Sequence, residues 1–519
     1  MISINSLLRR NAKDSSSELA KERDKLNKPA RFFGRDPVAF DLVTQLTYMS
    51  AIATAGISRA QLFEHTANLN YSTSVLFRRI HWAAQRLNYD YAQACEVVAE
   101  TLTDENMRSL LLRFASALSS GEGEAPFLAR EMEVQLELYG KQYERDLETL
   151  QRWTDAYVAL MVSAALIVVI SLVSMMIYSM GAGLIIGLAA VVIGTTFIGS
   201  YIVYTVAPLE IKGCSLADFS HERHFAALLA RYVLPVGLAA SAGVMLLGFS
   251  LAVAFITMSV FLFPVGMLAF REDRQIDRRD RDIASVLRAM GSMVTAMGST
   301  VGEALTRMNR RSLGSLEPQV KRLHVRLRNG LRSDLSWTRF AAESGSEMVS
   351  RSVRIFWDGV RLGGDAEGIS RLASALAMKV SLLRASRKLV SSTFTFVMIP
   401  LHVALLSILL FVSQVLVIFG AKMVEVQSQG LDTSVASDAS VSPTLLFAAP
   451  NMDFVRSFII AVILVLTLAN TFAPYAASGG HPYKLCLYGA VMCFLSGLAM
   501  LVIPSIVQTL FASVSAPIQ

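Results

Sequence analysis

The stretch VALMVSAALIVVISLVSMMIYSMGAGLIIGLAAVVIGTTFIGSYIVYTVA, residues 158–207, carries no charged side chain in 50 consecutive residues. A helix needs about 20 mostly apolar residues to cross the roughly 30 Å of hydrocarbon in a bilayer, so this stretch predicts two spans that turn near residues 181–183. The composition agrees, because 53% of the 519 residues are hydrophobic and 17% are charged, whereas soluble domains carry about 25% charged residues. The sequence therefore predicts an all-α integral membrane protein and disfavours a disordered chain, a coiled-coil rod and a purely soluble enzyme.

Five further spans follow, for a total of about seven transmembrane helices. Residues 232–270 are uncharged and long enough for two spans that turn near Gly248. Single spans are predicted at 393–421, 454–475 and 483–512.

The distribution of Lys and Arg sets the orientation of these spans, since both residues collect on the cytoplasmic side of a membrane. With the N-terminus in the cytoplasm, only Lys422 and Arg456 of the 48 Lys and Arg residues lie outside. This orientation makes 208–231 a cytoplasmic loop and 422–453 an external loop. It also places the C-terminus outside the cell.

Two cytoplasmic segments of similar length, 37–157 and 271–392, share a pattern of glycines and their neighbours. The first reads SAIATAGISRAQLFE around Gly56 and FASALSSGEGEAPFLARE around Gly121, and the second reads SMVTAMGSTVGEALTRM around Gly298 and WDGVRLGGDAEGISRLA around Gly364. The glycine spacing is 65 residues in the first segment and 66 in the second, and an acid, Glu122 or Asp365, follows the second glycine. The pattern predicts an internal duplication.

Both segments have the periodicity of helices. Apolar residues recur at steps of three and four after Pro126 and again from Ile369, which places them on one helix face. Each segment is therefore predicted to fold as a small antiparallel helical bundle whose last helix continues into the membrane. Residues 1–36 are rich in charge and are interpreted as a flexible cytoplasmic tail.

Two helical cytoplasmic domains, each with a glycine-plus-acid turn and a last helix that enters the membrane, resemble the type II secretion F family. This family contains the inner-membrane platform proteins of type IV pili, type II secretion systems and the archaellum. The resemblance covers nearly all of residues 37–420. Bacterial pilus platforms usually have one span between the two domains, whereas this sequence predicts four there and three afterwards, a layout that resembles the archaeal branch.

The resemblance implies a non-enzymatic role in assembling an archaellum or an archaeal type IV pilus in the cell membrane. A hexameric secretion ATPase would dock beneath the platform in the cytoplasm. The platform would couple the motion of the ATPase to the insertion of pilin or archaellin subunits into the growing filament. The resemblance also implies a homo-oligomer surrounded by membrane lipids.

The residues themselves indicate no catalytic, cofactor or metal site. The sequence lacks the G-x-x-x-x-G-K-[ST] loop that cradles a triphosphate, so any ATP has to be handled by a partner. The four cysteines (Cys95, Cys214, Cys486 and Cys493) form no C-x-x-C pair and indicate neither a disulfide framework nor a zinc site. Nucleic-acid binding is not predicted, because no basic face with stacked aromatic residues is visible.

An uneven division of charge points to a partner of the second segment. Residues 1–157 have a net charge of −2 and residues 271–392 a net charge of +10. Arg322, Arg326 and Arg328 belong to this excess and are candidates for contact with an acidic surface on the ATPase. Attraction to the anionic inner leaflet is the alternative interpretation.

The glycine–acid turns are candidates for the same ATPase interface. They comprise Gly121 with Glu122 and Gly364 with Asp365. The alternative is that these glycines meet a backbone requirement of a tight turn between helices.

Four residues within the spans are candidates for helix packing or for contact with a filament subunit. Gly183 and Gly187 form a G-x-x-x-G pattern that lets helix backbones approach closely. His402 and Asn470 are polar residues in otherwise apolar spans, where they bond to a neighbouring helix or face a subunit in the bilayer.

A membrane transporter or channel is the alternative function. Seven spans and an intramembrane histidine favour it. The spans nevertheless lack Asp, Glu, Lys and Arg away from their ends, and a permease does not require two large duplicated cytoplasmic domains. The sequence therefore favours the platform.

Overall fold

The computed structural model describes residues 38–177, 182–214, 221–308, 313–430 and 452–514, so the predicted tail 1–36 lies outside the described residues. Helices dominate the described ranges and no strand occurs in them, which confirms the all-α class. The chain divides into two compact units. The polar unit contains Met1–Asp146, Pro208–His221 and Asp273–Ser386, and the membrane unit contains Leu147–Ala207, Glu222–Glu272 and Arg387–Gln519.

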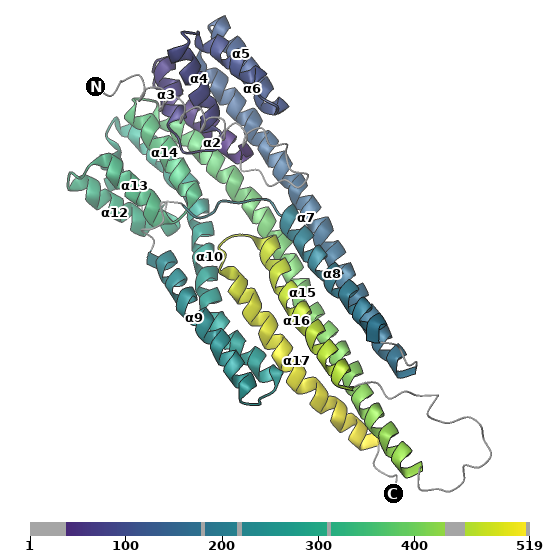
Figure 1. Cartoon of the computed structure of the whole chain (residues 1–519). Helices are drawn as coiled ribbons and strands as arrows, with labels where there is room; N and C mark the ends of the chain where they lie inside the picture. The colour runs from purple at the N-terminus through teal and green to yellow at the C-terminus, as the bar shows by residue number, and fades with distance from the viewer. Residues whose placement is uncertain (1–37, 178–181, 215–220, 309–312, 431–451, 515–519) are drawn as a thin grey trace, which may run out of the picture. The chain divides into compact units, whose positions relative to one another are not determined.

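The polar unit is built from two runs of short helices, each of which ends in a long helix (Figure 1). The first run contains α2 (Val38–Ala53), α3 (Arg59–Ala67), α4 (Ser74–Arg86), α5 (Tyr91–Glu100), α6 (Glu105–Ser120) and the start of α7 (Glu124–Ile177). The second contains the end of α10 (Leu251–Met297), α11 (Val301–Arg307), a 3₁₀ turn (Gly314–Leu316), α12 (Glu317–Arg328), α13 (Ser333–Ser344), α14 (Glu347–Arg361) and the start of α15 (Ala366–Gly430).

Corresponding helices of the two runs begin 242 residues apart in the sequence. This offset relates the starts of α3 and α11, of α5 and α13, of α6 and α14, and of α7 and α15. It also relates Ser58 to Thr300, which are the N-caps of α3 and α11 and are both extended. Asp104 and Ser346 correspond in the same way, and each accepts a hydrogen bond from the backbone N–H three residues on, which satisfies a free donor at the helix start.

In the structure, the glycine of the second run that corresponds to Gly121 is Gly363, one residue before the glycine matched in the sequence. Gly121 ends α6 with φ of 74°, and the residue with positive φ after α14 is Gly363 (93°), whereas Gly364 was paired with Gly121 in the sequence. Counted to Gly363, the spacing from Gly298 becomes 65 residues, equal to that between Gly56 and Gly121. Left-handed backbone at a helix C-terminus favours glycine because it has no Cβ, so conformation identifies the match better than sequence.

A single hydrophobic core joins both runs of the polar unit. Its fully buried members include Phe63 and Phe114 from the first run and Trp337 and Phe356 from the second. The sequence predicts two small bundles, and the structure packs them in one compact unit, with α2 against α14.

A buried arginine crosses the boundary between the two runs. Arg351 of α14 lies 2.6 Å from Asp41 of α2 and 2.8 Å from Glu347, and all three side chains are less than 15% exposed. The guanidinium of Arg351 also lies over the rings of Phe40 and Tyr71, at 4.6 and 4.4 Å from their centroids. Burial opposes this charge, but Tyr71, Asp41 and Glu347 raise the pKa of Arg351.

The membrane unit contains the long apolar helices. Six helices in the described ranges are long and apolar enough to cross a membrane, namely α7, α9 (His221–Leu246), α10, α15, α16 (Met452–Ser478) and α17 (Lys484–Val514). The uncharged helix α8 (Ala182–Val206) occupies the remaining predicted span. Gly248 has positive φ between α9 and α10, at the predicted turn. The chain is therefore a multi-pass membrane protein.

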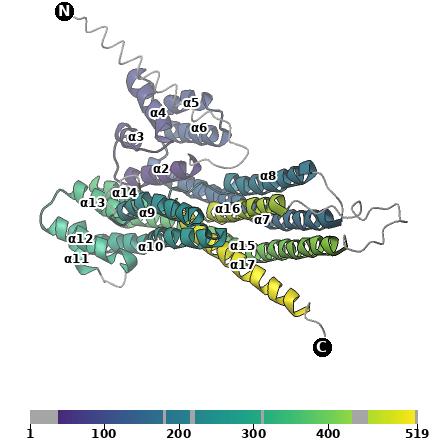
Figure 2. The same ribbon diagram turned by 60° about the horizontal axis from the view of Figure 1, so that its bottom comes forward.

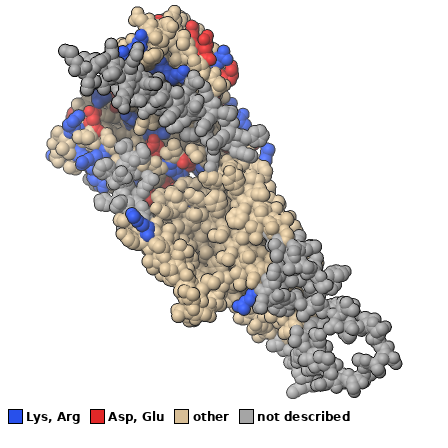
Figure 3. Space-filling view, viewed as in Figure 1, with Lys and Arg blue, Asp and Glu red and all other residues tan. Residues whose placement is uncertain are grey.

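Charged side chains are concentrated on the polar unit, while the visible face of the membrane unit carries very few (Figure 3). Within the membrane unit, α16 packs against α8 and α17 (Figures 1 and 2). The predicted external loop 422–453 begins as a continuation of α15 to Gly430, and residues 431–451 lie outside the described ranges.

Two glycines let α10 and α17 approach closely. A Cβ on Gly266 of α10 would overlap the backbone of Leu487, and a Cβ on Gly497 of α17 would lie 2.8 Å from the carbonyl oxygen of Ala252. Ser259 of α10 also donates a hydrogen bond of 2.7 Å to the carbonyl oxygen of Ala490. Small residues at such crossings favour helix association in lipid, where the hydrophobic effect between helices is absent.

Replacing Gly266 with Ala should lower the thermal stability of the chain purified in detergent. The added methyl group meets backbone atoms, so the two helices have to separate at a cost of about 1–3 kcal/mol. Gly243→Ala is the matched control, because a Cβ there meets nothing within 4 Å. Equal unfolding temperatures for the two variants would contradict the close approach of α10 and α17.

Candidate functional site: a buried charge network beside residues 208–214

The segment 208–214, which leads from α8 towards α9, is bound to the polar unit by its backbone. The N–H of Glu347 donates to the carbonyl of Lys212 at 2.9 Å, and the N–H of Cys214 donates to the carbonyl of Gly345 at 3.1 Å. Gly213 and Ser346 pair in an antiparallel bridge. The segment is thereby fixed to the turn between α13 and α14.

Lys212 brings a positive charge from this segment to two acids on α10. Its Nζ lies 3.0 Å from Asp277 and 3.5 Å from Asp273, which are one helical turn apart and so share a face. The side chains of Lys212 and Asp273 are 11% and 8% exposed. Burial opposes the charge of Lys212, but the neighbouring Asp273, Glu210 and Asp277 outweigh it and raise the pKa of Lys212.

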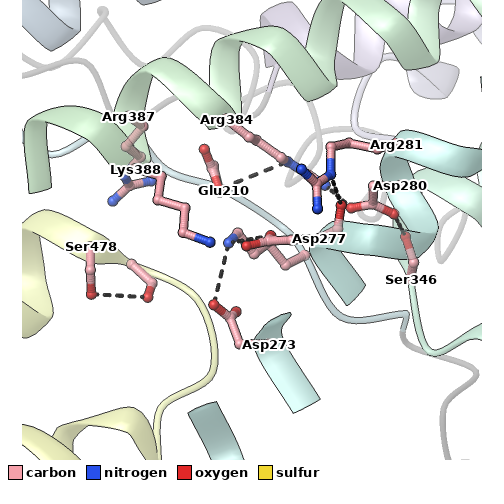
Figure 4. Close-up of polar contacts among 12 residues, drawn as sticks. Glu210, Asp273, Asp277, Asp280, Arg281, Ser346, Arg384, Arg387, Lys388 and Ser478 are labelled. Carbon is pink, nitrogen blue, oxygen red and sulfur yellow. Dashed lines mark hydrogen bonds and ion pairs between the residues drawn. The ribbon is translucent and has the colours of Figure 1, made fainter. Parts of the chain in front are cut away.

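Arg384 of α15 forms the second centre of the network (Figure 4). Its guanidinium donates to Asp280 of α10 and lies 3.9 Å from Glu210. Ser346, the N-cap of α14, donates to the other oxygen of Asp280. The side chains of Arg384 and Asp280 are 8% and 2% exposed. Burial works against the charge of Arg384, and Asp280 and Glu210 overcome it and raise the pKa of Arg384.

The network connects four parts of the chain that lead into membrane helices. Asp273, Asp277 and Asp280 lie on α10, Arg384 lies on α15, and Glu210 and Lys212 precede α9. Tyr143 of α7 donates its hydroxyl to Glu210. A small pocket beside the network is lined by Phe40, Tyr139, Tyr143, Leu209 and Leu383 among others. The geometry offers ion pairs that hold helices together, and the described residues contain no cluster of His, Cys, Asp and Glu that could hold a metal ion.

Sequence reasoning missed this network. The available signal is the stretch REDRQIDRRDRD at 271–282, in which three acids recur at steps of four and three and so share one helix face. Their partners Lys212 and Arg384 lie far away in the sequence and leave no periodic mark.

The predicted glycine–acid turns lie on the surface of the polar unit and have local roles. Gly121 is the exposed left-handed cap of α6, and Glu122 pairs with Arg130. Asp365 caps α15 by accepting from the N–H groups of Glu367 (3.2 Å) and Gly368 (2.8 Å). A Cβ on Gly364 would lie 2.6 Å from Thr54 Oγ1, so this glycine permits a close contact with the end of the first run's leading helix.

The three candidate arginines of α12 differ in their surroundings. Arg322 lies 2.8 Å from Glu343 of α13, and Arg326 pairs with the same carboxylate while being only 17% exposed. Burial opposes the charge of Glu343, but Arg326 and Arg322 outweigh it and lower the pKa of Glu343. Arg328 is exposed at the end of the helix.

His402 and Asn470 belong to a continuous chain of hydrogen bonds inside the membrane unit. The chain runs from Tyr157 through Asn470 (3.1 Å), His402 (2.9 Å) and Ser496 (2.9 Å) to Thr467 (2.8 Å), which donates to the carbonyl of Ile463 (2.7 Å). Both His402 and Asn470 are fully buried, so the structure places them between helices and away from the surface.

The G-x-x-x-G pattern of Gly183 and Gly187 in α8 does not lie at a close helix crossing within the described side chains. Gly187 is exposed, and a Cβ there would meet no described atom within 4 Å. The surroundings of Gly183 lie outside the described side chains. Glycines at which an added Cβ would overlap a neighbour in the membrane unit include Gly266, Gly497 and, in α8 itself, Gly199.

Comparison with known proteins finds relatives over most of the chain. The chain is 24% identical over 443 residues to the "Flagella accessory protein J" of Methanocaldococcus jannaschii, a match that covers 82% of this chain and 76% of the relative. It is 22% identical over 459 residues to the protein of the same name from Methanococcus voltae, covering 83% and 78%. No family model and no solved structure matches the chain.

The similarity to these two proteins agrees with the resemblance to the archaeal branch of the type II secretion F family. It confirms the resemblance that the glycine–acid turns and the arrangement of spans predict. The similarity to each relative covers more than four fifths of the chain.

Replacing Arg384 with Gln should destabilise the polar unit by about 3–5 kcal/mol, because it leaves the buried carboxylate of Asp280 without its cation. The loss of stability is measured by unfolding the full chain in detergent and monitoring the unfolded fraction by limited proteolysis. Arg371→Gln removes an exposed arginine from the same helix and should change stability by less than about 0.5 kcal/mol. A loss no greater than that of the control would show that Asp280 does not depend on Arg384.

A double-mutant cycle tests the hydrogen bond between His402 and Asn470. His402→Leu and Asn470→Leu each leave a buried polar group unpaired, whereas the double variant removes both groups. We expect a coupling free energy of about 0.6–1.7 kcal/mol, which lies between the average and the largest value for polar pairs in membranes. Additive effects in thermal unfolding would show that the two residues do not interact.

Proposed function

We propose that the chain is a membrane platform for the assembly of an archaellum or a related archaeal filament. One observation carries the proposal, namely the similarity over more than three quarters of each relative to two proteins named as flagella accessory proteins. In this role the chain is not an enzyme. It couples a cytoplasmic secretion ATPase to the insertion of filament subunits.

The continuity of three helices supports a coupling role. α7, α10 and α15 each contribute residues to both the polar unit and the membrane unit without a break. The charge network binds these three helices and the segment 208–214 to one another within the polar unit. A displacement imposed on the polar unit would therefore reach several spans together. α10, α15 and the segment 208–214 cannot separate without breaking buried ion pairs, and α7 is held to them by its hydrogen bond to Glu210.

The proposed topology places the polar unit in the cytoplasm and the C-terminus outside. The distribution of Lys and Arg supports it. The offset of 242 residues between corresponding helix starts supports an internal duplication of the polar unit. Two copies of a similar helical surface would give the ATPase two related binding sites on each chain. A homo-oligomer of the chain would present several such pairs of sites.

The exposed arginines of α12 are the proposed contact with the ATPase. Arg328 is exposed at the C-terminal end of the helix, and Arg322 is 52% exposed despite its pairing with Glu343. Arg326 contributes less, since its side chain is mostly covered. The turns at Gly121 and Glu122 and at Gly364 and Asp365 are secondary candidates, and Gly121 and Asp365 are their exposed members.

Deletion and complementation test the proposal in the organism that carries the gene. A deletion strain should lack one class of surface filament in electron micrographs, and the wild-type gene should restore it. A deletion strain that still assembles every filament would contradict the platform function. Transport of a solute by the purified chain in liposomes would favour the transporter instead.

The same strain tests the proposed ATPase contact. The variant R322E/R328E should insert in the membrane at the normal level but recover less ATPase in a pull-down and restore fewer filaments, because reversed charges repel an acidic partner. R108E/R371E reverses two other exposed arginines and serves as the control. Equal recovery of the ATPase by both variants would exclude α12 as the contact.

A further inference from the structure

Where α10 enters the polar unit, its acids are paired with other parts of that unit, whereas several of its arginines are exposed. Asp273 and Asp277 bind Lys212, and Asp280 binds Arg384 and Ser346. A fourth acid, Asp282, accepts hydrogen bonds from the backbone and side chain of Ser315. All four carboxylates therefore have partners from other parts of the polar unit.

Three arginines of the same segment are instead exposed on one face of α10. Arg274, Arg278 and Arg281 recur at steps of four and three, so they share one helix face, and all three are exposed. Arg281 donates to the backbone carbonyl of Asp277 at 3.3 Å, which leaves its charge uncompensated. No ion pair joins any of these three arginines to an acid among the described residues. We call Arg274, Arg278 and Arg281 the arginine stripe.

Arg279 shows the contrast within the same segment. It points into the polar unit, where it donates to the carbonyl of Ser344 at 2.8 Å and to Gln275 at 3.2 Å. The helix thus turns one arginine inward for a structural bond and presents the stripe to solvent.

The position of the stripe along α10 places it at the membrane surface. The uncharged residues 251–270 of α10 precede it directly and belong to a candidate span. At 1.5 Å per residue, Arg274 and Arg281 lie about 6 and 16 Å along the axis from residue 270. The polar layer on each side of the hydrocarbon is about 5–7 Å thick, and an exposed charge acts over a screening length of about 8 Å.

We propose that the arginine stripe binds the phosphate groups of anionic lipids in the leaflet next to the polar unit. A guanidinium donates two parallel hydrogen bonds to a phosphate, which suits arginine better than lysine for this ligand. Clusters of basic residues directly after a span attract anionic headgroups. Continuity with the span favours lipid over a protein partner. The inference needs only that α10 crosses the membrane, so it stands or falls separately from the platform function.

Native mass spectrometry of the full chain in detergent tests the site. The delipidated chain is titrated with phosphatidylglycerol or phosphatidylcholine, and dissociation constants are obtained from the populations with bound lipid. We expect the wild-type chain to prefer phosphatidylglycerol. R274Q/R278Q/R281Q should weaken phosphatidylglycerol binding at least tenfold and leave phosphatidylcholine binding unchanged. High salt should weaken the wild-type preference and leave the variant unaffected.

Two further variants test whether the lipid preference depends on the position of the stripe and on the guanidinium group. R108Q/R339Q/R371Q removes three exposed arginines elsewhere in the polar unit and should keep the wild-type preference. R274K/R278K/R281K should retain part of the preference, because the charges stay while the paired hydrogen bonds are lost.

Three results would overturn the lipid site. The first is equal binding of both lipids by the wild-type chain. The second is that R274Q/R278Q/R281Q and R108Q/R339Q/R371Q lose the preference for phosphatidylglycerol to the same extent. The third is a stripe variant that keeps lipid but no longer binds the ATPase, which would make the stripe a protein contact.

Discussion

The carboxylate of Asp280 is removed from water inside the polar unit, and the arrangement around it depends on how that charge is compensated. An isolated ion in such a place costs several kcal/mol, so Asp280 requires a cation and hydrogen-bond donors at close range. Arg384 and Ser346 supply them from α15 and from the start of α14. Glu210 then approaches Arg384 and brings the segment 208–214 with it. One buried charge thereby fixes the relation of α10, α14, α15 and the segment that leads to α9.

The membrane unit meets the corresponding requirement without charge. Hydrocarbon offers no hydrogen bonds, so polar groups there have to satisfy one another. The hydrogen bonds that link Tyr157 to Ile463 can all be assigned in one direction. Tyr157 donates to Asn470, and Asn470 donates to His402. His402 then donates through Nε2 to Ser496, and Ser496 donates to Thr467. In this assignment His402 is neutral, and each of the five side chains donates one hydrogen bond to the next acceptor. Four helices, α7, α15, α16 and α17, are joined by it.

The spans and the helical class could be predicted because charge-free stretches of sufficient length allow few alternatives. The predicted turn at Gly248 is confirmed for the same reason, since a glycine between two spans is a local signal. The match of Gly121 to Gly364 was wrong by one residue, because two adjacent glycines look alike in the sequence and only Gly363 has positive φ. The pairing of Arg384 with Asp280 could not be foreseen, because tertiary contacts between distant helices leave no pattern in either stretch. Which glycines permit close helix crossings also depends on the packed partner: Gly266 does and Gly187 does not.

Under the proposed function, the chain transmits force and performs no chemistry on a nucleotide. The central claim is that work done by an ATPase in the cytoplasm passes through the polar unit to the spans. The most direct measurement is ATP hydrolysis by the full chain, alone and with the secretion ATPase, after reconstitution in liposomes. The account predicts no hydrolysis by the chain alone and a change in the rate of the ATPase when the chain is present. Hydrolysis by the chain alone, or an ATPase rate that the chain leaves unchanged, would contradict it.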